Sequence, residues 1–427
     1  EISYQNQRST IEVSSKDNDS EAVFLVRKRL SRIFYQKKFF DYPIKLSIKT
    51  VSKLGYLNTI LILFSYLKSV IFPIKNEQSL EDFFINRFGV RLYQTFFKDY
   101  TEKVWGVSCS EISAEWGAQR IKGLSITKTI LDVLQKPFRK KDINQKNTET
   151  SLIEYFLYPK YGPGQLWTKV AELVEEKGGI LHKNAKVIQL NGTKELTSAL
   201  VESGNKKIQS TITFDYCIST MPIKDLFNAF SFTIPSDIKY ISDNLVYRDF
   251  ITVGILLDKT KIELNDNWIY IQESYVKVGR IQVFNNWSPF LVKESHTIWL
   301  GLEYFCNESD TLWQLNEEEL IALATQELIQ LGFINASENV LDATVIKVPK
   351  TYPAYFGAYN EFYKIREFVD PIDNLFLVGR NGMHKYNNQD HSMLTAMQAV
   401  QNIKNGVLSK ENIWSINTEE EYHEEKK

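Results

Sequence analysis

The stretch Asn374-Leu375-Phe376-Leu377-Val378-Gly379-Arg380 decides the fold class. Its apolar run predicts a buried strand, and the glycine after it predicts a loop in which the backbone can approach a ligand closely. An amphipathic helix is expected from about His391 to Ile403, because apolar residues recur there at helical spacing. The sequence therefore predicts a strand, a loop and a helix in succession, as in an α/β fold.

The start of this helix is the first candidate binding site. The first turn of a helix has N–H groups without intrahelical partners and the positive end of the helix dipole. Both features suit a pyrophosphate or the electron-rich pyrimidine edge of a reduced flavin. Asp390 is the expected N-cap residue of the helix. An ordinary connection between a strand and a helix has the same pattern, so a purely structural role stays open.

A similar succession occurs nearer the middle of the chain. A tight loop at residues 158–164 precedes an expected helix over Leu166 to Lys177, which Gly178-Gly179 ends. Short apolar runs that predict β-strands then follow at residues 180–182, 186–190, 198–201, 208–214 and 215–222. This order predicts an α/β sheet with an inserted β-ribbon.

Two further parts have different patterns. One or two strands are expected within Val23 to Phe39, and helices are expected from Ser47 to about Leu134, one of them with Ser79 as its N-cap. A charged run at residues 135–150 predicts a surface loop. Residues 223–348 are rich in β patterns and aromatic side chains. They predict a second domain, an antiparallel sheet with helices at about 222–242 and 316–332.

Composition excludes several classes of protein. The 51 basic and 52 acidic residues give a net charge of −1, which disfavours a nucleic-acid-binding protein. Cys109, Cys217 and Cys306 lie far apart without a CxxC pair, so neither a zinc site nor a disulfide framework is expected. We expect a reducing, cytoplasmic location and no transmembrane segment. The apolar stretch from Tyr56 to Phe72 is interrupted by polar residues, which favours a core helix over a membrane-surface helix.

No glycine-rich dinucleotide loop of the form GxGxxG occurs in the 427 residues. Gly162-Pro163-Gly164 lacks the third glycine, and its proline lacks an N–H group for a phosphate. The chain starts at Glu1 without a methionine. We therefore expect an N-terminally truncated chain whose phosphate-binding loop precedes Glu1, and weak cofactor binding by residues 1–427 alone.

Four motifs carry a resemblance to known families. The sequence from Tyr100 to Gly106, YTEKVWG, resembles the YTxKxWG motif of UDP-galactopyranose mutases, and Leu245-Val246-Tyr247-Arg248 resembles their YR motif. Gly379-Arg380, Lys385-Tyr386 and Asp390 resemble the mutase segment at the flavin. The loop YPKYGPG at residues 158–164 is similar to the YPxxG motif of protoporphyrinogen oxidases and phytoene desaturases. Together they resemble the flavin amine-oxidase-like superfamily, and above all its protoporphyrinogen-oxidase-like FAD-dependent oxidoreductases.

The resemblance implies an α/β fold class with three parts. A partial FAD-binding, doubly wound (Rossmann-like) domain would carry an inserted α+β substrate domain and a helical subdomain. The implied boundaries are 1–45 for an FAD-domain or linker segment, 46–150 for the helical subdomain, 151–222 for an FAD-domain segment, 223–348 for the α+β substrate domain and 349–427 for the last FAD-domain segment.

The resemblance also implies a cofactor, FAD, and site residues. Arg380 would lie beside the flavin or the substrate phosphates, Tyr386 would point into the active cleft, and Arg280 would hold a nucleotide-sugar diphosphate. These three are the implied catalytic residues. The implied cofactor-binding residues are Gly379, Arg380, Asp390, His391, Ser392 and Met393.

Three functions remain open at this point. The first is an FAD-dependent oxidoreductase acting on a small molecule. The second is a mutase acting on a nucleotide sugar, although Asn387-Asn388-Gln389-Asp390 retains only the final Asp of the mutase YDMD motif. The third is a non-catalytic fragment. A metal site is not expected, because His384 and His391 have no third ligand at metal-binding spacing.

Overall fold

A computed structural model describes residues 2–4, 7–9, 21–42, 44, 47–114, 155–258, 260 and 263–416. The described residues form two compact units. Unit 1 comprises those of Glu1–Leu173 and Phe250–Lys347, and unit 2 comprises those of Val174–Asp249 and Val348–His423. Each unit is described by itself.

Unit 1 is built on a seven-stranded sheet with the order β15-β11-β14-β13-β12-β4-β5. Its central strands β11 and β14 bury consecutive side chains, which point to opposite faces, so both faces of the sheet are covered along these strands. The strands are β4 (Ser31–Tyr35), β5 (Lys38–Asp41), β11 (Tyr247–Leu257), β12 (Trp268–Ile271), β13 (Arg280–Val283), β14 (Ile298–Cys306) and β15 (Val340–Pro353).

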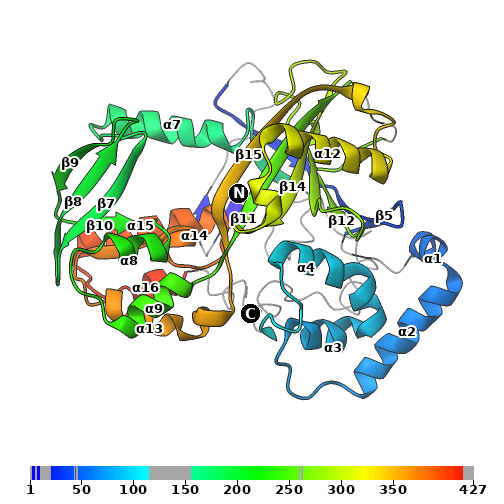
Figure 1. Cartoon of the computed structure of the whole chain (residues 1–427), viewed down its shortest axis with the longest axis horizontal. Helices are drawn as coiled ribbons and strands as arrows, with labels where there is room; N and C mark the ends of the chain where they lie inside the picture. The colour runs from blue at the N-terminus through cyan, green and yellow to red at the C-terminus, as the bar shows by residue number, and fades with distance from the viewer. Residues whose placement is uncertain are drawn as a thin grey trace. The chain divides into compact units, whose positions relative to one another are not determined.

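Helix α12 (Glu317–Leu331) covers the core face of this sheet (Figure 1). Asn316 and Glu319 form a capping box at its start, and Gly332 in the left-handed conformation ends it. Leu320, Ala324 and Leu328 pack with the sheet side chains. The helix expected at about 316–332 is therefore confirmed.

The helical part of unit 1 consists of α1 (Ile48–Leu54), α2 (Tyr56–Ile71), α3 (Leu80–Tyr93), the π-helix η1 (Gln94–Lys98) and α4 (Asp99–Trp105). Ser79 is the N-cap of α3, as predicted, and forms a capping box with Asp82. Gly89 interrupts α3 with a φ of 77°, a left-handed value that favours glycine. A Cβ atom at Gly89 would lie 2.7 Å from the backbone nitrogen of Tyr66, so α2 and α3 touch backbone to backbone here.

The remaining elements of unit 1 are short, apart from α7, which runs on into unit 2. They are β1 (Ile2–Tyr4), β2 (Gln7–Ser9), β3 (Phe24–Lys28), β6 (Tyr155–Pro159), α7 (Pro163–Glu176), α10 (Phe284–Trp287), α11 (Thr311–Gln314) and the 3-10 turn η4 (Ser337–Asn339). Strands β3 and β6 pair antiparallel.

Unit 2 combines a parallel strand pair with an antiparallel sheet. Strands β10 (Cys217–Ser219) and β16 (Leu375–Leu377) are parallel, and Ser219 lies opposite Leu377. The antiparallel sheet has the order β7 (Ala185–Gly192), β8 (Leu196–Ser203) and β9 (Ile208–Thr213). The helices are α8 (Ile223–Ala229), α9 (Ser236–Asn244), α13 (Phe362–Val369), α14 (Gly379–Gly382), α15 (Gln389–Asn405) and α16 (Glu411–Trp414), with the 3-10 turn η5 (Gly357–Glu361).

The parallel pair, the β-ribbon and the mixed α/β class are confirmed. Two expectations need correction. Residues 180–182 form no strand, because they follow the turn at Gly178-Gly179 without a partner strand among the described residues. The helix expected at 222–242 is two helices, since Pro235 precedes α9 and the chain is extended between them. Residues 115–134 and the loop at 135–150 lie outside the described residues.

The prediction of a core helix over Tyr56 to Phe72 is wrong. Helix α2 buries only Thr59, Ile62 and Ser69, and its other side chains are exposed or half-buried. Among the described residues no single helix is long and apolar enough to cross a bilayer, although α1 and α2, bent by 106° at their junction, meet the length and composition limits as a pair.

Candidate functional site

The carboxyl ends of β10 and β16 bring two loops together in unit 2. The Val378 N–H donates to Ser219 O at 3.0 Å, which extends the parallel pairing to the end of the strands. Gly379 follows with a φ of 74°, and its N–H donates to Thr395 Oγ1 at 3.0 Å. Gly379 thus turns the chain sharply at the end of β16, as predicted from the sequence.

Gly382 was not predicted as a site residue, yet its position is the tighter of the two. A Cβ atom there would lie 2.5 Å from Ser219 O and 3.2 Å from Thr220 Cα. Both are backbone atoms, so only glycine lets α14 lie against the end of β10. The signal in the sequence was a second glycine three residues after Gly379.

Helix α15 begins at Gln389, two residues earlier than expected. Asn388 is its N-cap and makes no side-chain capping bond, so the prediction of Asp390 as the N-cap is wrong. Asp390 lies instead in the first turn, where a carboxylate favours the positive end of the helix dipole. Asn388 and Gln389 are exposed, so the helix start is not covered by the described part of the unit.

The other predicted cofactor residues lie in the first turn of α15. His391 is buried, and its Nδ1 lies 3.3 Å from Asp390 Oδ1. Ser392 Oγ donates to Asn387 Oδ1 at 3.0 Å. Met393 is exposed. The structure therefore brings Gly379, the first turn of α15 and the loop between them into one cradle, which we call the Gly379–Met393 cradle.

Arg380 lies beside a stacked pair of tyrosine rings. Tyr352 and Tyr386 are stacked with ring centroids 5.6 Å apart, and the guanidinium carbon lies 4.6 Å from the Tyr386 ring and 5.3 Å from the Tyr352 ring. Arg380 Nε and Nη2 donate to Asn387 O, and Nη1 donates to Thr351 O at 3.1 Å. These contacts tie the cradle loop to the last residues of β15, which belong to unit 2.

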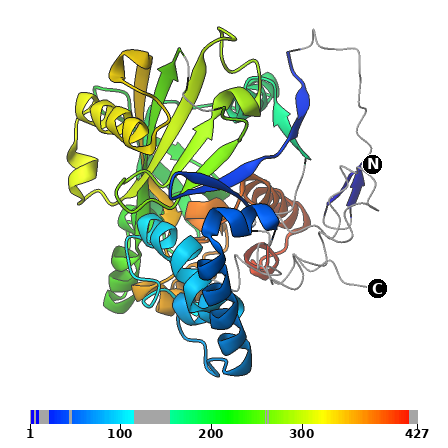
Figure 2. The same cartoon turned by 90° about the vertical axis from the view of Figure 1, so that its right-hand side faces the viewer.

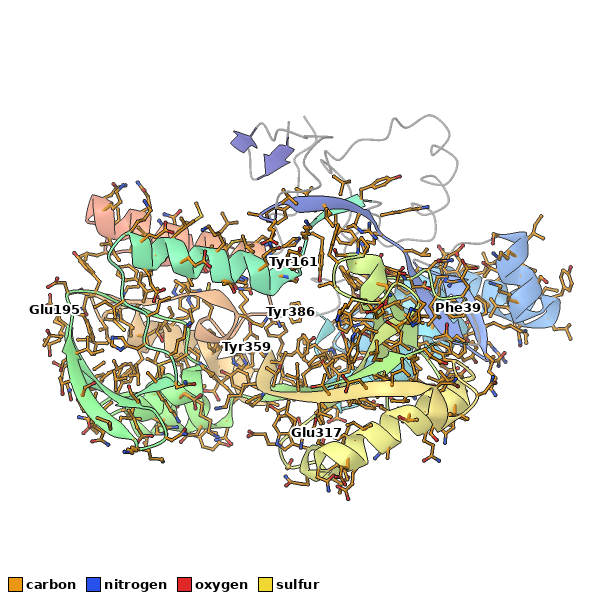
Figure 3. The ribbon with its side chains drawn as sticks, turned by 90° about the horizontal axis from the view of Figure 1, so that it is seen from above. Phe39, Tyr161, Glu195, Glu317, Tyr359 and Tyr386 are labelled. Carbon is orange, nitrogen blue, oxygen red and sulfur yellow. The ribbon has the colours of Figure 1, made fainter. Side chains whose placement is uncertain are left out.

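Further bonds fix the same loop. The Tyr386 N–H donates to the hydroxyl oxygen of Tyr355, and Asn381 Nδ2 donates to Lys350 O at 3.0 Å. Tyr386 and Tyr359 lie near each other in unit 2, as labelled in Figure 3. Lys350 has a φ of 54° and forms an ion pair with Asp225 at 2.8 Å. The loop is thus held by bonds to backbone carbonyls and by ring contacts, and Met383 also packs into the hydrophobic core of unit 2.

His384 sits at the base of the cradle loop and is fully buried. Its Nε2 donates to Ala354 O at 3.2 Å, while Nδ1 has no hydrogen-bond partner. The rings of Tyr247, Tyr359 and Phe362 surround it. Burial lowers the pKa of His384 to about 4, against the opposing effect of the bond to Ala354.

The burial of His384 predicts that the folded protein is less stable at acidic pH. Between pH 6.5 and 4 the unfolded chain protonates His384 and the folded chain does not, so the unfolded state binds more protons. The free energy of unfolding should fall by about 3 kcal/mol from this residue as the pH drops through that window. Urea denaturation at several pH values should show a flatter profile for His384→Phe. The exposed His182→Phe serves as control, and an unchanged profile for His384→Phe would contradict the assignment.

Arg280 lies in unit 1, on β13, opposite Glu303 of β14. Its Nε donates to Glu303, whose side chain is fully buried, and Gln282 donates to the other carboxylate oxygen. The guanidinium carbon also lies 5.6 Å from the Trp268 ring. Arg280 and Arg380 belong to different units, so the structure does not test the prediction that both serve one site.

The motif at Tyr100 to Gly106 has a structural task in unit 1. Lys103 Nζ donates to Glu273 O at 2.6 Å and to Val278 O at 3.3 Å. Burial lowers its pKa to about 8. Gln272 joins the same region, because its side chain accepts from the Tyr100 N–H and donates to Phe96 O. The motif thus fixes η1 and α4 to the turn after β12.

No three His, Cys, Asp or Glu side chains in the described ranges come together as metal ligands would.

No protein-family model matches the chain. A solved structure of reduced UDP-galactopyranose mutase superposes with a TM-score of 0.76 and 19% identity, over 93% of this chain and 83% of that one. A candidate protoporphyrinogen oxidase from Exiguobacterium sp. 255-15 gives a TM-score of 0.61 and 12% identity, over 89% and 82% of the two chains. Putrescine oxidase bound to putrescine gives a TM-score of 0.53 and 11% identity, over 89% and 83%.

This chain therefore shares the fold of these solved structures over about nine tenths of its length, so the fold class expected from the sequence is confirmed. The chain has a mixed α/β fold similar to the FAD-binding, Rossmann-like folds of flavoenzymes.

Proposed function

We propose that the protein is an FAD-dependent oxidoreductase that acts on a small molecule. The Gly379–Met393 cradle supports the proposal most directly. It joins a parallel strand end, a left-handed glycine and an exposed helix start, which is the arrangement that suits a cofactor at the carboxyl edge of an α/β sheet.

The residues of the cradle fit a flavin. Gly379 and Gly382 keep side chains away from the end of the strand pair, and the first turn of α15 directs its N–H groups outward. Because no GxGxxG sequence occurs in residues 1–427, the cradle is proposed to hold the ring end of FAD rather than its phosphates. When bound, FAD supplies the acceptor for a hydride or for electrons from the substrate.

Arg380 is proposed to position the cofactor. Its three nitrogens donate to backbone carbonyls and its guanidinium lies beside two stacked rings, so it holds the loop from Gly379 to Asn387 in shape. Its positive charge beside the cradle would favour a reduced, negatively charged flavin ring. Tyr386, stacked on the guanidinium, is proposed to face the substrate, and Asp390, His391, Ser392 and Met393 are proposed to contact the flavin.

A nucleotide-sugar mutase is the second candidate, favoured by the TM-score of 0.76 to UDP-galactopyranose mutase. In that case Arg280 would hold a diphosphate. The pairing of Arg280 with the buried Glu303 argues against this role, because a carboxylate already neutralises the guanidinium and would repel an anion.

The test starts with the protein purified from its full reading frame. A flavin absorbance spectrum, loss of that absorbance on anaerobic addition of substrate amines or a reduced tetrapyrrole, and its return with oxygen would support the oxidoreductase. Turnover of UDP-galactopyranose without net oxidation would favour the mutase instead. Protein that shows no flavin absorbance even after incubation with FAD would overturn both and support the non-catalytic fragment.

Replacing Arg380 by lysine should weaken flavin binding. A lysine cannot make these forked bonds or lie flat against a ring, and each bond from a charged donor contributes about 1.5–3 kcal/mol. We expect FAD affinity to fall by at least about tenfold. The flavin midpoint potential should stay nearly unchanged in this variant, because lysine keeps the positive charge. Arg366→Lys is the matched control, since Arg366 pairs with the exposed Glu411 and stacks on Trp414. Fluorescence titration measures the affinity. Spectroelectrochemistry of Arg380→Gln, which removes the charge, should show a more negative midpoint potential, and an unchanged potential in R380Q would refute the charge effect.

A further inference from the structure

Helix α2 presents an apolar face away from α3, the element that it contacts most among the described residues. The face consists of side chains three or four residues apart along the helix, and they are between 42% and 74% exposed: Tyr56, Ile60, Leu63, Phe64, Leu67 and Ile71. Leu57 is 79% exposed beside them, and Phe72 continues the apolar surface past the helix end. Contiguous apolar surface of this kind marks an interaction site on most proteins.

The opposite face of α2 is anchored firmly. Thr59, Ile62 and Ser69 are buried against the rest of unit 1, and Ser65 Oγ accepts from the Arg91 N–H at 3.1 Å. Figure 2 shows α2 in blue at the edge of the helical part, with the cyan helices on one side of it. Because α2 cannot rotate about its axis without breaking this contact, the apolar face stays directed outward, and nothing among the described residues covers it.

The charge of this segment is of one sign. Residues 42–76 contain five lysines and no aspartate or glutamate, in a chain whose total charge is −1. Lys49, Lys68 and Lys75 are exposed. Lys53 is directed inward instead, where it donates to Phe39 O. An apolar helix face bordered by exposed lysines has the composition of a helix that lies in the interface of an anionic bilayer.

The geometry of the junction between α1 and α2 also fits a location on a membrane surface. Gly55 has a φ of 86°, and the two helices meet at 106° there. Ile48, at the start of α1, is 89% exposed. Two short helices at nearly a right angle can both lie flat on a membrane, whereas a spanning helix would need a straight stretch of about 20 apolar residues.

We infer that α1 and α2 form a membrane-docking surface that places unit 1 on a bilayer with anionic lipid headgroups. A second copy of this chain is the main rival occupant of the apolar face. It fits less well, because a two-fold interface would bring the exposed lysines of both copies together without a carboxylate in the segment to neutralise them.

The test uses the full chain and sonicated vesicles. Co-sedimentation with vesicles of phosphatidylcholine and phosphatidylglycerol at 3:1 should exceed that with phosphatidylcholine alone by about tenfold, and 0.5 M salt should reduce the difference. The double variant F64S/L67S should lower binding to both kinds of vesicle by about tenfold. The control Y240S/L408S removes two side chains that are 66% and 65% exposed in unit 2, and it should bind as the unchanged protein does.

A charge variant keeps the inference testable if F64S/L67S fails to fold. K68Q/K75Q retains the apolar face and should lose only the preference for anionic vesicles. Failure of the unchanged protein to bind anionic vesicles overturns the inference. So does a result in which F64S/L67S converts a dimer to a monomer by light scattering without changing vesicle binding, since the face would then belong to a second copy.

Discussion

Replacing Gly382 by alanine should destabilise unit 2 and abolish flavin binding. The new Cβ atom would lie 2.5 Å from Ser219 O, a backbone atom that also accepts from the Val378 N–H. Neither atom can move without disturbing the register between β10 and β16. We expect the free energy of unfolding to fall by about 3 kcal/mol, at the upper end of overpacking effects, and FAD binding to fall below detection as the cradle loop shifts.

Gly164→Ala is the matched control for this change. Gly164 lies near the start of α7, and a Cβ atom there would meet nothing within 4 Å. Alanine should stabilise that helix by about 0.5–1 kcal/mol. Denaturant unfolding and flavin absorbance of both variants supply the comparison. Equal stabilities for G382A and G164A would show that the close approach of α14 to β10 is absent in solution.

Replacing Arg280 by alanine should lower the free energy of unfolding of unit 1 by a similar amount. Arg280→Ala leaves the Glu303 carboxylate fully buried with only the Gln282 amide beside it. Breaking a buried ion pair in this way typically costs 3–5 kcal/mol. The double variant R280M/E303L removes both charges and should regain most of the lost stability, because well-packed apolar replacements of buried pairs are often neutral.

The same two variants, R280A and R280M/E303L, distinguish a purely structural role of Arg280 from a role in substrate binding. If Arg280 serves only Glu303, R280M/E303L should unfold near the midpoint of the unchanged protein and keep its KM. If Arg280 also binds a diphosphate, the double variant should recover stability but show a KM at least about tenfold higher for the phosphorylated substrate. A loss of stability in the double variant as large as in R280A would contradict the pairing itself.

The strand and helix around Gly379 could be predicted because their signals are local. The apolar run at residues 375–378 and the spacing of the α15 side chains follow the periodicity of each element. The N-cap was misplaced by two residues, since Asn388 and Asp390 are equally good cap residues and nothing local distinguishes them. Gly382 was missed because its constraint comes from Ser219, far away in the chain.

Helix α2 shows the limit of hydropathy alone. From the sequence alone, an apolar stretch with a few polar residues is expected to be buried in the core. The same helix can instead expose its apolar side chains to solvent when some of its polar residues face the protein. Here Thr59 and Ser69 are buried together with Ile62, whereas most of the other apolar residues are exposed. The pairing of Arg280 with Glu303 could not be predicted from the sequence either. It depends on the register between β13 and β14, which no sequence motif indicates.

The contacts of Lys103 bear on how the motif at Tyr100 to Gly106 is interpreted in other sequences. Its ammonium group caps the carbonyls of a turn, and Gln272 fastens the neighbouring helix to the same place. In this chain the YTEKVWG signature therefore has a structural role, which is to join two parts of unit 1. Proteins that share it can be expected to build the same corner of the helical region while differing in what they transform.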